Sequence, residues 1–220
     1  MSSSQDTALT NSTAGTRRLP HWLLEGLFIV ASVALGFGVA QFGAYRSDRE
    51  LASRVLNSLV AEVAHNSSIL EPFVPIHGNW VEALAEAGAA PGQSALDAFF
   101  ATRPAMPPGA KSPFPFLRRS AWDAALSGGA LRLLDYDIAA VLSEIYRMQE
   151  TAEENVDRLA QGPLAAVATY DPASRVPAVR LLWLTLADIQ SAEAALLDLY
   201  QQHLPALREA TGTNAPSRLP

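Results

Sequence analysis

The chain has 220 residues, with 22 acidic and 16 basic side chains, a formal net charge of -6 and no cysteine. The acidic balance argues against a nucleic-acid-binding protein, which needs clustered lysine and arginine to neutralise phosphates. Without cysteine there can be no disulfide, thiolate zinc site or cysteine nucleophile. The length suits one ordinary domain, with room for an anchor.

The N-terminal part is predicted to be a disordered tail followed by a membrane anchor. Residues 1–20 are mostly small and polar, and bury too little apolar surface to offset the entropy of ordering. The run from Trp22 to Tyr45 carries one charge, Glu25, and would reach about 36 Å as a helix, against a hydrocarbon core of about 30 Å. We therefore predict a transmembrane helix over residues 21–46, surrounded by the lipid bilayer, and keep a cleaved signal peptide as the alternative.

Small residues recur along this predicted span at every fourth position. Such a stripe lets a second helix approach closely, which predicts a homodimer formed through the anchor. The stripe consists of Ser32, Gly36, Ala40 and Ala44. Arginines flank both ends of the span, and their count leans toward a cytoplasmic domain, whereas a short basic tail beside an uncleaved anchor favours a periplasmic one. We favour a single-pass protein of a bacterial inner membrane with a periplasmic main domain.

Residues 47–211 are predicted to form a helical domain whose first helix continues from the anchor. No helix breaker separates Tyr45 from Leu70, and apolar residues follow in alternating steps of four and three. This seam consists of Ala52, Leu56, Leu59, Val63, Asn66 and Leu70. Packing within the domain is favoured over a short coiled coil. Asn66 would need a hydrogen-bond partner if buried, and Glu62, one turn earlier, is a local candidate.

Prolines and helix-start residues divide the next part of the domain. Pro72 and Pro75 are expected to end the first helix, with a short helix from His77 and a weaker helical patch over residues 94–101. The proline-rich residues 103–116 are predicted to be an extended surface loop, interpreted as a connection, with a binding segment as the alternative. Ser120 is the expected N-cap of a short helix, with Asp123 in a variant capping box.

The C-terminal part is predicted to contain two long helices. Gly128 and Gly129 should stop the short helix, and a long helix begins at Asp135 or Asp137 and ends before Gly162. A last helix begins around Pro177, and residues 212–220 form a disordered tail. No strand pattern is present, so the predicted fold class is all-α, a transmembrane helix continuing into an irregular antiparallel helical bundle.

Two further stretches are distinctive. The first is the early acid Glu25 followed by SLVAEVAHN, with Glu62 and Asn66 one turn apart, and the second covers residues 121–146. These stretches resemble a group of uncharacterised bacterial proteins with an N-terminal anchor and a helical domain of unknown function. Together they span about a third of the chain. The resemblance implies membrane anchoring and helical architecture, and no activity. The abundance of alanine and a single lysine, Lys111, also suggest a bacterium with a GC-rich genome.

The standard catalytic motifs are missing from the sequence, and its four histidines lack the spacing of zinc ligands. We therefore predict no catalytic residue, metal or cofactor, and no enzyme. The densest polar cluster consists of Trp122, Asp123, Asp135, Tyr136 and Asp137. Paired carboxylates beside an aromatic ring suit acid–base work or cation binding, but helix capping is the favoured interpretation.

The sequence leaves three classes of function. A non-catalytic interaction or scaffold protein with an unknown protein partner is favoured. A helical sensor of a small ligand that signals through a partner is the alternative, and it would need a cavity lined by groups such as Trp80, Trp122, Tyr146 or Arg147. An enzyme would need clustered titratable groups in a cleft.

Overall fold

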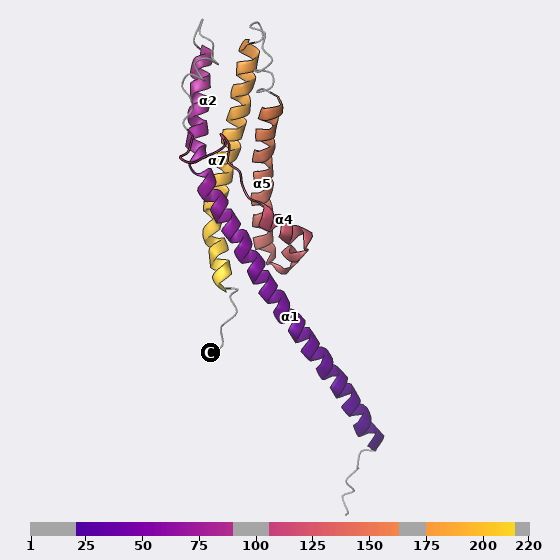
Figure 1. Cartoon of the computed structure of the whole chain (residues 1–220). Coiled ribbons are helices and arrows are strands. Elements are labelled where there is room, and N and C mark those ends of the chain that lie inside the picture. Colours follow the sequence, from indigo (N-terminus) through magenta and orange to yellow (C-terminus); the bar gives the residue numbers. More distant parts are fainter. Residues whose placement is uncertain (1–20, 90–105, 163–174, 214–220) are drawn as a thin grey trace, which may run out of the picture. The chain divides into compact units, whose positions relative to one another are not determined.

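The computed structural model describes residues 21–89, 106–162 and 175–213. Their elements in chain order are α1 (His21–Leu70), α2 (Phe73–Ala89), α4 (Ser120–Ser127), the short 3₁₀ helix η1 (Ala130–Leu133), α5 (Tyr136–Gln161) and α7 (Arg175–Thr213) (Figure 1). The all-α class is thus confirmed for these ranges, which contain no strand. The predicted tail 1–20, the patch 94–101 and residues 103–105 lie outside the described residues.

The chain divides into two compact units, Met1–Arg46 and Ser47–Pro220. The described part of the first unit is the N-terminal half of α1. Its large apolar side chains are exposed on every face of the helix, at Phe28, Ile29, Val30, Val33, Leu35, Phe37, Val39, Phe42 and Tyr45. By length and composition, this one helix in the described ranges is apolar enough to cross a membrane. A signal sequence has the same properties.

The second unit has two apolar clusters. The larger one joins the α1 seam to α4, α5 and α7, with Leu56, Leu59, Val63 and Leu70 almost fully buried. The smaller one joins α2, α5 and α7 through Trp80, Leu84, Leu159, Leu182, Leu186 and Ile189. The seam predicted from sequence therefore packs within the chain, as the favoured interpretation expected.

Helix boundaries differ from the sequence prediction at two places. α1 ends before Pro72, but α2 begins at Phe73 and not at His77. Pro75 lies in the first turn of α2, where a missing N–H removes no intrahelical bond. α7 continues past Pro205 to Thr213, so Gly212 and Thr213 are helical and not part of the tail, a difference within the usual fraying of helix ends.

The turn after α4 follows the prediction. α4 ends at Ser127, and Gly129 follows with φ 64°, in the left-handed region that glycine adopts without strain. α5 then begins with Asp135 as its N-cap, whose side chain accepts a 3.0 Å hydrogen bond from the Asp137 amide.

Candidate functional site

One surface segment, Ser112–Trp122, is held in place by buried side chains of three helices, and we call it the pinned segment. Side-chain to main-chain hydrogen bonds between residues far apart in sequence all end on this segment in the described part of the chain. The side chains involved are Glu62, Asn66, His77 and Gln149. Buried polar groups cost free energy unless they are paired. In the second unit these four side chains find hydrogen-bond partners in the pinned segment.

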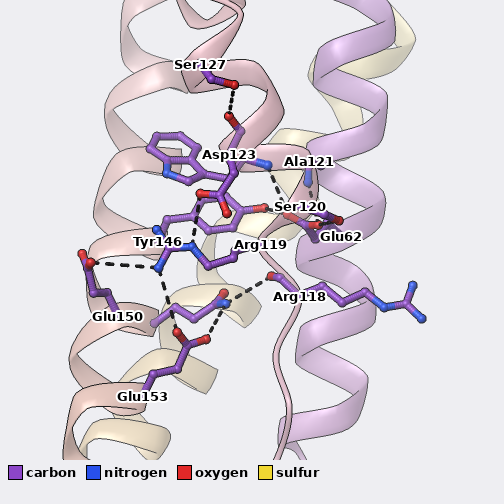
Figure 2. A network of polar contacts seen from close by, with 12 residues as sticks. Glu62, Arg118, Arg119, Ser120, Ala121, Asp123, Ser127, Tyr146, Glu150 and Glu153 are labelled. Carbon is purple, nitrogen blue, oxygen red and sulfur yellow. Dashed lines mark hydrogen bonds and ion pairs between the residues drawn. The ribbon is translucent and has the colours of Figure 1, made fainter.

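Glu62 of α1 caps the N-terminus of α4 (Figure 2). Its carboxylate accepts hydrogen bonds from the Ser120 hydroxyl at 2.9 Å, the Ala121 amide at 2.9 Å and the Trp122 amide at 3.3 Å. The free N–H groups and the dipole of a helix start favour a carboxylate at this place. The prediction that Ser120 is the N-cap is wrong, because Arg119 holds that position without a side-chain bond, and the cap comes from another helix.

Tyr146 of α5 completes the surroundings of Glu62. Its hydroxyl donates a 2.7 Å hydrogen bond to Glu62, and its ring stacks on Trp122 with centroids 4.6 Å apart and an interplanar angle of 16°. Burial raises the pKa of Tyr146 far above its usual range, and the hydrogen bond to Glu62 raises it further. The phenol therefore remains a neutral donor to the buried carboxylate.

Asn66, which is fully buried, binds the main chain of the pinned segment in two directions. Its amide donates to the Arg118 carbonyl at 2.7 Å and accepts from the Arg118 amide at 2.8 Å, as a neighbouring strand would. Gln149 of α5 donates to the same carbonyl at 3.1 Å and accepts from Asn66 and from the Tyr200 hydroxyl. Asn66 thus has its partner in the pinned segment, and not in Glu62 as the sequence suggested.

His77 of α2 joins the segment to α7. Its Nε2 lies 2.9 Å from the Pro113 carbonyl, and its Nδ1 lies 2.5 Å from Oε2 of Glu193. Because a carbonyl only accepts, the hydrogen bond to Pro113 requires a hydrogen on Nε2. The other carboxylate oxygen of Glu193 is buried without a hydrogen-bond partner among the described residues. The ring also packs against Phe73, Trp80 and Phe114.

The residues of the possible polar cluster have different surroundings in the structure. Trp122 is buried, whereas Tyr136 is 83% exposed, and Asp135 and Asp137 form the capped start of α5. Asp123 is exposed and accepts from Arg119 Nε at 3.2 Å, so it pairs with this arginine and closes no capping box. Asp135 thus has the helix-capping role that was the favoured interpretation, and a common acid–base or cation site stays untested.

Arg119 connects the pinned segment to the acidic surface of α5. Besides Asp123 it approaches Glu150 at 4.0 Å and Glu153 at 3.9 Å. The hydrogen bond with Asp123 raises the pKa of Arg119, and the nearby carboxylates add to this, so the guanidinium is firmly charged. All these side chains are partly or largely exposed, so the ion pairs add little to stability.

The predicted helix-pairing stripe lies on exposed surface of the first unit. Ser32 bonds back to the Phe28 carbonyl at 2.7 Å, and a side chain built on Gly36 would meet nothing within 4 Å. The residues Ser32, Gly36, Ala40 and Ala44 are all exposed. Helix pairing through this stripe stays a prediction.

The groups that a small-ligand cavity would have used are packed or exposed. Trp80 lies against His77, Trp122 lies on Tyr146, and Arg147 is exposed. In the described ranges, no three histidine, aspartate or glutamate side chains are placed to hold a metal ion. No protein-family model, curated protein or solved structure matches the chain.

Proposed function

We propose that this protein is a single-pass, membrane-anchored helical protein that acts by binding other protein surfaces and not by catalysis. In this proposal α1 crosses a bacterial inner membrane, the second unit lies on the periplasmic side, and its helices form an irregular antiparallel bundle. The anchors of two copies pair through the stripe at Ser32, Gly36, Ala40 and Ala44.

Support for the anchor comes from the exposed apolar residues between Phe28 and Tyr45. A water-soluble protein rarely exposes large apolar side chains on every face of a helix, because the unfavourable hydration has no compensation. A bilayer removes this cost, and the helix satisfies its own main-chain hydrogen bonds in lipid.

The observation that carries the binding role is the pinned segment. Four buried polar side chains hold the main chain of this segment at Pro113, at Arg118 and in the first turn of α4, which a mere connection would not require. A surface segment that is ordered before it meets a partner loses less entropy on binding. Catalysis, by contrast, needs polar groups directed at a substrate, whereas these side chains are directed at the chain's own amides and carbonyls.

Reporters that work on only one side of the membrane, fused to the C-terminus, test the anchor and its orientation. We expect activity from a reporter of the periplasmic side and an intact mass that includes residues 21–46. A shorter mature chain would show cleavage of a signal peptide and contradict the anchor, and activity of a cytoplasmic reporter would contradict the orientation.

Crosslinking of the full chain in membranes tests the pairing of anchors. Gly36→Leu places a large side chain in the middle of the stripe and should reduce crosslinks between anchors, whereas Leu35→Ile, on a neighbouring face, should leave them unchanged. Equal crosslinking of wild type and Gly36→Leu would contradict pairing through this face while leaving the anchor itself intact.

A further inference from the structure

The pinned segment buries one side and exposes the other. Phe114 and Leu117 pack against the two apolar clusters, while Phe116 is 79% exposed. Arg118 in the segment and Lys111 just before it are also exposed. An exposed phenylalanine on a backbone held by buried hydrogen bonds cannot turn inward by a simple loop movement. The segment therefore presents the Phe116 ring and the Arg118 cation to the outside from a main chain that is held in place, and Lys111 directly precedes it.

The two cations are available to an external partner. Neither Lys111 nor Arg118 forms an ion pair with any residue of the described ranges, whereas Arg119 is engaged by Asp123. Figure 2 shows the Arg118 side chain extending away from the polar network, on the side opposite to Glu150 and Glu153. The segment is thus a local basic surface on a chain of net charge -6.

A surface of complementary charge lies on α5 of the same chain. α5 carries six acidic residues and two basic ones, and Glu144, Glu150, Glu154 and Asp157 are exposed. Arg119 joins the pinned segment to this acidic side of α5 through Glu150 and Glu153. A chain that carries both a basic and an acidic surface can pair around a two-fold axis, because the rotation can bring the basic surface of each copy to the acidic surface of the other.

We infer that two copies of the second unit bind each other through the pinned segment and the acidic side of α5. Phe116 lies at the centre of this contact, and Lys111 and Arg118 of each copy face the α5 carboxylates of the other. Charge complementarity favours this orientation of the two copies. It disfavours an orientation without the two-fold rotation, in which like charges would face each other. The inference rests on the proposed binding function, and anchors in one membrane would raise the effective concentration of the contact.

Energy-transfer measurements on the full chain in lipid nanodiscs and in detergent micelles, at increasing dilution and salt, test this contact. We perform them in the Gly36→Leu background, so that pairing of anchors does not hide pairing of the second units. Phe116→Ala and Arg118→Glu should each weaken association about tenfold or more, as loss of a central contact does. The matched controls Tyr136→Ala and Arg132→Glu, an exposed aromatic and an exposed cation elsewhere, should leave association unchanged.

Charge reversal provides the sharper test. Glu150→Arg with Glu154→Arg should weaken association, and adding Lys111→Glu with Arg118→Glu to the same chain should restore it, because each copy then again faces its opposite. These side chains are exposed, so circular dichroism should show the same helix content in every variant.

Two outcomes would overturn the inference. The first is association that is the same in wild type, Phe116→Ala and Arg118→Glu, or a wild type that stays monomeric at every concentration. The second is a photoreactive residue at position 116 that crosslinks in cells to another protein and not to a second copy. Either result leaves the anchor untouched, whereas loss of wild-type protein from the membrane fraction would contradict the proposed function instead.

Discussion

At the scale of single residues, Glu62 shows how one side chain determines the position of a helix. Its carboxylate accepts from two main-chain amides, a serine hydroxyl and a phenol, and only 7% of the residue is exposed. In Glu62→Gln one acceptor oxygen becomes a donor amide, which leaves buried donors unpaired. We expect a loss of about 2–3 kcal/mol in unfolding free energy.

Urea unfolding of the full chain in detergent, followed by tryptophan fluorescence, measures this loss. Glu144→Gln, an exposed change on α5, is the control and should stay within about 0.5 kcal/mol of wild type. Equal midpoints for both variants would mean that Glu62 contributes nothing special at the start of α4.

The raised pKa values of two buried tyrosines allow a prediction of how the free energy of unfolding changes at alkaline pH. Burial raises the pKa of Tyr146 and Tyr200 above the ordinary value, while unfolded tyrosines release their protons near about pH 10. The folded chain then holds more protons than the unfolded chain, so this stabilisation is complete below about pH 10 and stability falls as the pH rises further. Tyrosinate absorbance should show these two rings ionising only as the fold opens.

Tyr146→Phe identifies the part of the tyrosinate absorbance that comes from Tyr146. It should remove one tyrosine from the rise in absorbance that accompanies unfolding and reduce the dependence of unfolding free energy on pH above about 10. If it instead removes signal before the fold opens, the ring ionises in the native state and its burial is not as described.

At the scale of helices, α4 and α5 begin in different ways. Asp135 caps α5 from the adjacent sequence, whereas α4 receives its cap from α1. Asp135→Ala should therefore cost about 1 kcal/mol, the usual value of an N-cap. Asp123→Ala removes only an exposed ion pair and should cost less than about 0.5 kcal/mol. Unfolding midpoints of the two variants compare them directly, and equal losses would contradict this distinction.

The same contrast explains how much the sequence could predict. Helix periodicity placed the α1 seam, and local chemistry placed the Asp135 cap and the glycine turn, since both depend on neighbours in the chain. The partners of Glu62, Asn66 and His77 lie 36 or more positions away and have no periodic signature. Asn66 on an apolar seam was the one visible sign of a buried polar contact. Of the polar cluster, local sequence could predict the Asp135 cap, whereas the burial of Trp122 against Tyr146 depends on a residue of another helix.

At the scale of the whole molecule, the question is whether the exposed apolar residues of α1 hold the protein in a membrane. Leu35→Arg together with Val39→Arg places two like charges one turn apart within this stretch. Each should raise the cost of membrane insertion by about 3 kcal/mol. We expect the double variant to leave the fraction that resists alkaline extraction, while Tyr136→Arg in the second unit stays in it. Retention of the double variant would mean that something other than this helix attaches the protein to the membrane, and the second unit would then become the place to look for that attachment.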